Sequence, residues 1–340
     1  MKKKIISSVI FLVIIIAIVI NLNRVVLDKT YNRYYIMSQE IKDNLDNGEE
    51  YDVQVYGSCH AYTSFDTKMF GRLTGNEAYN MANPSEIIPV TYLRMREIFK
   101  KQVPDIVFVE TWGINPDNTY IDESTILGDY MLLNLQDVPF SIDKVGVIND
   151  YHGDWGILDT EIFLRNYKKR IVEQTVYEYD YNYSFETLSD SIDYADPRKW
   201  IINDMSNRIS NDGYLENGYN KLKEYPGEKL KGQNIKKCTE PDERMIKYLD
   251  KIVHLCKENH VKLVFYKAPF SQTKEEIEVG NWLTNYCKEN EVMYYDTEEY
   301  IDYSVETDFI DEAHLSFVGA DKMTIFFANE LENINEFYEK

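Results

Sequence analysis

Apolar runs of strand length alternate with amphipathic helical segments in this chain, and this alternation is what most limits the folds open to it. Residues 104–110 read Pro-Asp-Ile-Val-Phe-Val-Glu, a nearly all-apolar run that is typical of a strand buried on both faces. Two later apolar runs, at 261–266 and 292–295, flank a predicted helix at 273–289. Because strands that alternate with helices form parallel, doubly wound sheets, the sequence predicts an α/β fold with a parallel sheet.

The same pattern predicts the remaining strands and helices. Further strands are predicted at 51–56 and 76–81, and further helices at 90–101, 241–258 and 316–338. Ligands of doubly wound sheets bind at the carboxyl ends of the strands. The positions that fall at such ends are Cys59, Asn83, Glu110, Lys267 and the loop 296–314.

The alternation is lost between residues 116 and 236. This segment is polar and rich in Tyr, Asp and Asn, with helical pieces such as 159–174, and the whole chain holds 28 tyrosines. Tyr combines a flat apolar ring with a polar tip, which suits carbohydrate or polymer surfaces, although a partly buried aromatic surface is the simpler interpretation. We interpret 116–236 as a large central insertion that caps the sheet.

The N-terminus predicts a membrane anchor. Three lysines precede the apolar run 5–20, which is near the lower limit of roughly 17–25 residues for a spanning helix. The run lacks the small-residue cleavage site of a signal peptide, and the preceding lysines place the N-terminus in the cytoplasm. We therefore expect a single-pass plasma-membrane anchor at 1–23, a stalk or leading helix at 24–50, and an extracytoplasmic domain at 51–340.

Charge and cysteine content exclude some classes of function. The net charge is −21, from 37 basic and 58 acidic residues, which argues against nucleic acid as a partner. None of the four cysteines forms a CxxC pair, which argues against a zinc knuckle. Cys256 and Cys287 fall on apolar faces of predicted helices and are expected to be buried free thiols. Cys59 differs, because it lies at a turn.

That turn, Gly57-Ser58-Cys59-His60, directly follows the first predicted strand. A strand that ends in Gly, then a small nucleophile, then a turn toward a helix is how α/β hydrolytic enzymes expose a reactive atom at the edge of a sheet. A second motif, Asp311-Glu-Ala-His314, directly precedes the last predicted helix. Both motifs are expected at the same edge of the sheet, which makes them candidates for one catalytic site.

The two motifs together predict acyl-transfer chemistry. His314 would take the proton of the nucleophile, and Asp311, three positions earlier, would orient the imidazole. Cys59 would attack an acyl carbonyl and form a thioester, since a thiolate forms more easily than an alkoxide. The oxyanion would be held by backbone N–H groups near Cys59 and His60, with the Asn83 side chain as a further donor.

Simpler interpretations remain beside this one. His314 could cap the last helix, and Cys59 could be a small core residue at a strand end. A metal could be held by His60, Asp66, Asp311 and His314, but no spacing requires it, and neither a metal nor a cofactor is predicted. Surface or structural roles are the simpler interpretation for four histidines, namely His60, His152, His254 and His260.

Gly57-Ser-Cys-His60 together with Asp311-x-x-His314 resembles the SGNH/GDSL hydrolase superfamily. The nearer likeness is to its membrane-anchored, extracytoplasmic branch, which includes the D-alanylation protein of teichoic acid synthesis and alginate-type acetyltransferases. Members of that branch commonly read Gly-Ser-Ser-His at the first block. The resemblance covers 51–110 and 240–335 and implies a flavodoxin-like three-layer α/β/α sandwich. It also implies residue 59 as nucleophile, Asp311 as acid and His314 as base.

The sequence departs from that pattern in three places. Cys59 stands where the family has Ser, the block 80–85 lacks the usual oxyanion Gly, and in the block 109–115 only Asn115 matches the usual oxyanion Asn. Ser58 is an alternative nucleophile, although the register of strand and turn makes it the less exposed of the pair. The candidates for oxyanion or substrate contacts are Ser58, His60, Asn83, Asn115 and Lys267.

The resemblance implies an esterase or O-acyltransferase that acts on a cell-envelope polysaccharide or teichoic-acid-like polymer. A multi-pass membrane O-acyltransferase is the partner it suggests. Hydrolysis and transfer both stay open, since both pass through one acyl-enzyme. The alternative is a catalytically silent SGNH-like envelope protein that binds a glycan or that membrane partner.

Overall fold

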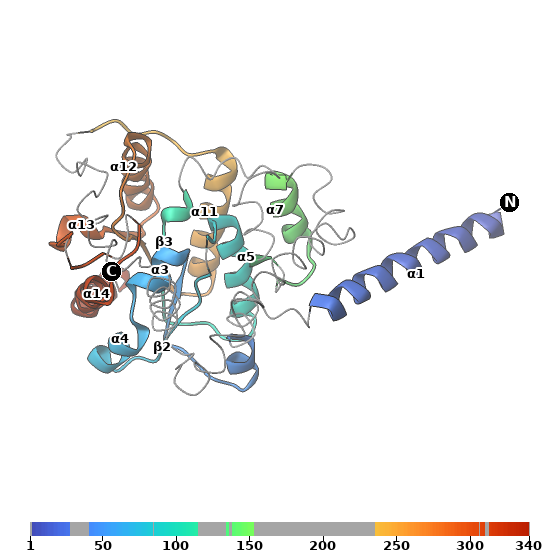
Figure 1. Cartoon of the computed structure of the whole chain (residues 1–340), viewed down its shortest axis with the longest axis horizontal. Coiled ribbons are helices and arrows are strands. Elements are labelled where there is room, and N and C mark those ends of the chain that lie inside the picture. Colours follow the sequence, from blue (N-terminus) through green and yellow to red (C-terminus); the bar gives the residue numbers. More distant parts are fainter. Residues whose placement is uncertain are drawn as a thin grey trace, which may run out of the picture.

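A five-stranded, all-parallel sheet forms the centre of this protein in its computed structural model (Figure 1). The structure describes residues 2–27, 41–83, 85–114, 134–135, 138–152, 235–305, 307–309 and 313–339. The strand order is β2-β1-β3-β4-β5, one of the common orders of doubly wound sheets. The strands are β1 (Val53–Tyr56), β2 (Ala78–Asn80), β3 (Ile106–Glu110), β4 (Lys262–Lys267) and β5 (Met293–Asp296).

Helices cover both faces of the sheet, as the mixed α/β pattern predicts (Figure 1). One face carries α5 (Ile88–Phe99), α7 (Ile142–His152), α11 (Glu243–Glu258) and α12 (Lys274–Glu289). The other carries α3 (Cys59–Ser64), α4 (Thr67–Thr74) and α14 (Phe317–Tyr338). Two short helices, η1 (Trp112–Ile114) and α13 (Thr297–Tyr300), follow β3 and β5.

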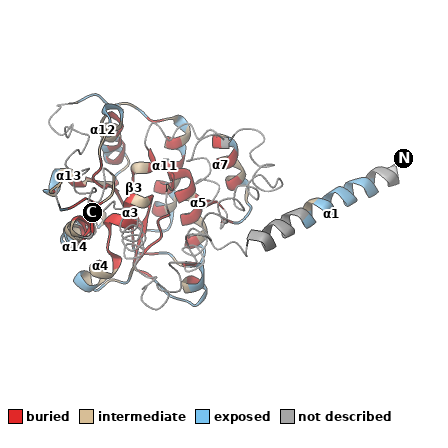
Figure 2. Ribbon diagram, in the orientation of Figure 1, coloured by how far each residue is buried: buried red, intermediate tan, exposed pale blue. Residues whose placement is uncertain are grey.

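The central strand β3 shows why this sequence needs two covered faces. Its side chains alternate between the two hydrophobic cores, with Val107 and Val109 in one and Ile106 and Phe108 in the other. All of its residues are buried, and Figure 2 colours buried residues red on helices of both layers. The continuous apolar run is therefore the sequence signature of a parallel strand packed on both sides.

All five strands and four long helices confirm the predicted elements to within about three residues. Helices α4 and α7 were not predicted, and α7 lies inside the segment interpreted as an insertion. It packs against α5, and Val147 and Ile148 join the core of that face. Part of the predicted insertion thus belongs to the folded body, whereas the helical piece expected at 159–174 lies outside the described residues.

The N-terminal segment forms helix α1 (Lys2–Leu27), 26 residues long, and its described side chains at 6–18 are almost all exposed. In α1 the structure describes the side chains of residues 6–18 alone, and over the described residues no helix is both long and apolar enough to cross a membrane. The stretch expected to be a stalk is helical at 41–46, and its Ile41 and Leu45 are buried in the core. These residues therefore belong to the folded domain.

The start of α14 fits tightly against the loop before it at Gly319. A Cβ atom at Gly319 would lie 2.3 Å from the carbonyl oxygen of Asp308, a distance that no side chain tolerates. In contrast, a Cβ atom at Gly280 in α12 would meet nothing within 4 Å. Only the first of these glycines is required by packing.

We predict that Gly319→Ala lowers the free energy of unfolding by about 2–3 kcal/mol, because the loop must move away from the helix. The matched change Gly280→Ala should raise it by about 0.5–1 kcal/mol, since Ala is the better helix former. Denaturant unfolding of both variants beside the wild type measures the two effects. Equal stability of the two variants would contradict the packing argument.

Candidate active site

The turn that carries the predicted nucleophile depends on Gly57, the residue after β1. Its φ is +135°, a backbone conformation that side chains disfavour. A Cβ atom there would lie 2.7 Å from the Cβ of Glu110 at the end of β3. Glycine is therefore needed for close approach as well as for backbone conformation, and it allows the chain to turn at once into α3.

Ser58 joins this turn to the neighbouring strand. Its hydroxyl is buried, donates a hydrogen bond to Oε2 of Glu110 (2.9 Å) and accepts one from the His60 N–H (3.2 Å). In this way Ser58 is the N-cap of α3. With its hydroxyl used in these two bonds, Ser58 is placed as a structural residue, and Cys59, half-buried and next in the chain, is the more accessible of the pair.

Glu110 is a fully buried carboxyl beneath the turn. Burial raises its pKa to about 7, against the opposing effect of hydrogen bonds from the Trp112 N–H (2.8 Å) and from Ser58. A charge at this position is costly, and the hydrogen bonds are what make it tolerable. Glu110 therefore ties the ends of β1 and β3 together near the predicted nucleophile.

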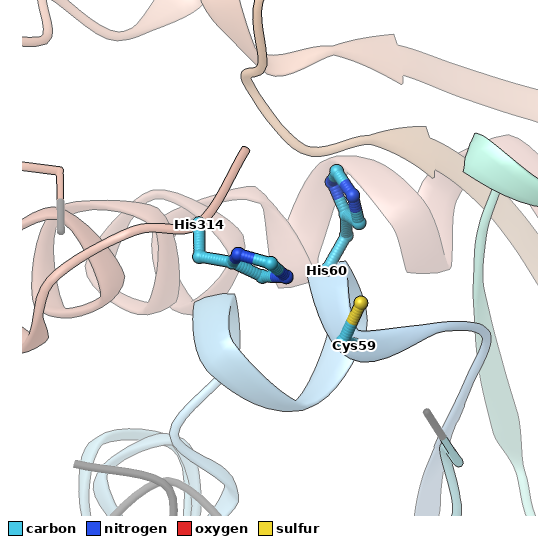
Figure 3. Close-up of side chains that lie close together, drawn as sticks. All are labelled: Cys59, His60 and His314. Atoms are coloured by element: carbon cyan, nitrogen blue, oxygen red, sulfur yellow. The ribbon is translucent and has the colours of Figure 1, made fainter. Parts of the chain in front are cut away.

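Cys59, His60 and His314 come together above this turn. One ligand-type atom of each, the Cys59 sulfur and a ring nitrogen of each histidine, all lie within 4.8 Å of one another. Figure 3 shows Cys59 and His60 at the start of α3, with His314 approaching from the loop before α14. The two motifs that are far apart in the sequence thus meet at the carboxyl edge of the sheet, as predicted.

His60 is a central, buried member of this group, which excludes the surface role and leaves the structural and site roles that the sequence offered. Its ring stacks on Trp112 at 5.3 Å between centroids, meets the edge of Phe270 at 5.3 Å and tilts against His314 at 5.2 Å. Trp112 and Phe270 were not singled out from the sequence, because their contacts join loops after different strands. His254, in contrast, is exposed and lies beside Glu258.

The loop that carries His314 is held at its base. Phe309 and Leu315 form an antiparallel bridge, and the Ser316 N–H donates to the Asp308 carbonyl (2.8 Å). The Ser316 hydroxyl donates to the Thr307 carbonyl (2.7 Å) and caps α14. These bonds hold His314 close to the start of α14, and the residue that caps this helix is Ser316.

Asp308 fixes the same loop through its buried carboxylate. Burial raises its pKa, but hydrogen bonds from the Lys322 amine (2.6 Å), the Ser304 N–H (2.8 Å) and the Thr307 hydroxyl lower it overall. Its carboxylate therefore stays charged and holds the loop against α14. Asp311, the predicted orienting acid, lies outside the described residues, as does Asn115.

Asn83 is the predicted oxyanion donor that the fold places best. It is fully buried, and its backbone N–H donates to the Gly57 carbonyl (3.1 Å). Burial raises the pKa of the nearby Glu86, and Arg94 and the Asn83 side chain oppose that shift. Within the part of the chain that is described, neither polar atom of the Asn83 amide makes a hydrogen bond of good geometry. An unsatisfied amide in the interior is unusual in a folded protein and calls for a partner such as a ligand or a water molecule.

Lys267 is at the end of β4, as predicted, but its amine is occupied there. It forms an ion pair with Asp296 (2.6 Å) and donates to the Gln272 side chain (3.0 Å). Lys267 thus joins the ends of β4 and β5. Asp66, named in the alternative metal set, instead accepts from the Met69 N–H (2.9 Å) and caps α4.

Comparison with known proteins adds a match to a protein family. The sequence profile of an uncharacterised protein family matches residues 202–336. The match includes His314 and ends before the last residues of α14, but it does not reach Cys59 or His60. No curated protein matches the chain.

Glu110 makes stability depend on pH in a defined window. Its pKa in the folded protein, about 7, is above the ordinary value of 4.5, so the folded state holds this proton more tightly than the unfolded state does. The stabilising contribution of this proton to the free energy of unfolding is therefore fully present below pH 4.5 and is lost as the pH rises to about 7. We predict that the stability of Glu110→Gln does not fall over this pH range, whereas the wild type loses about 3 kcal/mol.

Denaturant unfolding between pH 4 and 8 measures this difference between wild type and variant. Glu97→Gln is the matched control. Partial burial raises the pKa of Glu97, but Lys100 and Arg96 lower it overall, so its contribution to stability is lost only as the pH falls below about 4.5. Glu97→Gln should therefore leave the dependence of stability on pH between 5 and 8 unchanged. The same dependence of stability on pH in wild type and Glu110→Gln would contradict the raised pKa of Glu110.

Proposed function

We propose that this protein is an SGNH-like acyl-transfer enzyme, an esterase or O-acyltransferase, with Cys59 as nucleophile and His314 as general base. The observation that carries the proposal is the cluster of the Cys59 sulfur with imidazole nitrogens at the carboxyl edge of a parallel sheet. Ligands of doubly wound sheets bind at this edge. A thiol beside an imidazole is the arrangement that nucleophilic catalysis by cysteine requires.

In the proposed reaction His314 takes the thiol proton while the Cys59 sulfur attacks the carbonyl carbon of an ester. The tetrahedral intermediate collapses, the bond to the leaving alkoxide breaks, and the alkoxide takes the proton from the imidazolium. A thioester on Cys59 remains. Water or an acceptor hydroxyl, deprotonated by the same imidazole, then attacks the thioester and regenerates the thiol. Asp311 is the proposed orienting acid of His314.

Asn83 and His60 have supporting roles in this scheme. The backbone N–H of Asn83 bonds the Gly57 carbonyl, and its buried side-chain amide is the proposed donor to the oxyanion that forms on the carbonyl oxygen. The His60 ring lies against His314 and is fixed by Trp112 and Phe270, which suits it to position the base and to line the acyl site. The preceding Ser58 keeps Cys59 at the start of α3.

We extend the same proposal to the detailed fold class and to the cellular location. The strand order supports a flavodoxin-like three-layer sandwich. Exposed apolar side chains along α1, after lysines at its start, support a single-pass plasma-membrane anchor with the domain outside the cytoplasm. Such a location fits a cell-envelope polymer as substrate and a multi-pass membrane O-acyltransferase as partner.

The first test is acylation of the full chain in detergent by an activated acyl ester, followed by intact-mass measurement. Cys238 is an exposed free thiol, so the experiment is done in a Cys238→Ala background. We expect a single adduct, which is lost in Cys59→Ala and forms about 10²–10⁴-fold more slowly in His314→Ala. Folded protein that forms no adduct, or an adduct that survives Cys59→Ala, would contradict the proposal and favour the glycan-binding alternative.

A second test separates the oxyanion role of Asn83 from a structural one. Asn83→Ala should slow ester hydrolysis by about 10²–10³-fold with only a small loss of stability, because the amide makes no hydrogen bond of good geometry in the described structure and interacts weakly with Glu86. The control is Asn80→Ala. The Asn80 side chain bonds the Ala61 carbonyl (3.2 Å) and the Ala82 N–H (3.1 Å), so this change should lower stability more than Asn83→Ala does. Unchanged kcat in Asn83→Ala would remove Asn83 from the site.

A further inference from the structure

The donor atoms of the Cys59, His60 and His314 cluster are also those of a metal site. One sulfur and two imidazole nitrogens lie within 4.8 Å of one another, and they come from residues that are buried or half-buried. Thiolate and imidazole are the ligands that Zn²⁺ prefers, and three protein ligands with one open position is the usual arrangement of a reactive zinc site. The cluster therefore has the composition of a zinc site as well as that of a catalytic pair.

We propose that Cys59, His60 and His314 bind one Zn²⁺ ion, and that zinc and the acyl group compete for the Cys59 sulfur. On binding, the thiol releases its proton to solvent and the sulfur lone pair forms the bond to zinc, with no change of oxidation state. The open fourth position is left to water. The metal site stands on its own geometry, whereas the competition rests on the proposed function.

The geometry needs only a small adjustment to hold the ion. Zinc bonds of about 2.0–2.3 Å place tetrahedral ligand atoms about 3.5 Å apart, so the widest separation in the cluster must close by roughly 1 Å. Side-chain rotation covers a difference of this size. Two of the three ligands are already fixed, because Cys59 and His60 follow the Ser58 cap and the His60 ring packs on Trp112 and Phe270.

This set differs from the one that the sequence offered. Asp66 was part of that set, but its carboxylate caps α4, and Cys59 takes its place among the ligands. Cys238 makes a useful contrast, since it is an exposed thiol beside the Asn285 amide. The surplus of acidic residues over the whole chain also favours cations near the protein.

Titration of the full chain in detergent with Co²⁺ tests the site directly, because Co²⁺ bound to a thiolate gives a charge-transfer absorption band. We expect one Co²⁺ per chain with this band, and displacement of Co²⁺ by Zn²⁺. The band should disappear in Cys59→Ser, the affinity should fall at least tenfold in His60→Asn and in His314→Asn, and Cys238→Ser should leave both unchanged. No band in the wild type, or a band that survives Cys59→Ser, would overturn the metal site.

Alkylation and acylation then separate this inference from the proposed function. In a Cys238→Ser background, Zn²⁺ should slow alkylation of Cys59 at least tenfold and should inhibit acylation to a similar extent. Metal binding without any acylation would remove the proposed function and leave the metal site. Acylation that is unaffected by Zn²⁺, or is accelerated by it, would overturn the competition while the acyl-enzyme stands.

Discussion

At Gly57 the end of strand β1 lies so close to strand β3 that a side chain in its place would collide with Glu110. The arrangement of the site follows from this approach. It brings Ser58 within hydrogen-bonding distance of the buried Glu110 carboxyl, and the same hydroxyl then caps α3. Cys59 is consequently the first residue of a helix whose position is set by two strands. The proposed nucleophile, held in this way, needs no ordering step before it reacts, which is what preorganisation requires.

The second half of the site reaches the same place from the far end of the chain. The Asp308 carboxylate, the Ser316 cap and the close contact at Gly319 together fix the described segments on both sides of His314. His60 then links the two halves, since its ring contacts His314 and packs against Trp112. The cluster is therefore supported from both sides by residues whose own role is structural. The same support that places an imidazole beside a thiol also gathers the donor atoms of the proposed metal site.

Much of the fold could be predicted from local patterns, and the reason is physical. Strands buried on both faces need continuous apolar runs such as residues 106–110, and long helices need an apolar stripe, so both leave a local record. Helix α4 is too short for such a stripe to be read, and α7 lies among polar residues. The carboxyl ends of the strands follow from the parallel arrangement, which is why Cys59 and His314 could be expected to meet.

The parts of the site that sequence did not predict depend on contacts between distant segments. The buried position of His60 results from packing against loops after β3 and β4, which no local spacing records. Glu110 was expected at a strand end, but its bond to Ser58 depends on the close approach at Gly57. Lys267 was expected at the same edge, and its ion pair with Asp296 exists only because β4 and β5 are neighbours.

The central claim is that the acyl group is carried by the Cys59 sulfur, and the most direct measurement is to locate it. The full chain would be quenched in acid during turnover of an ester substrate, digested, and mapped by tandem mass spectrometry before and after neutral hydroxylamine. The account predicts an acyl group on Cys59 that hydroxylamine removes, as expected of a thioester. An acyl group on the adjacent Ser58, or turnover with neither residue acylated, would contradict it.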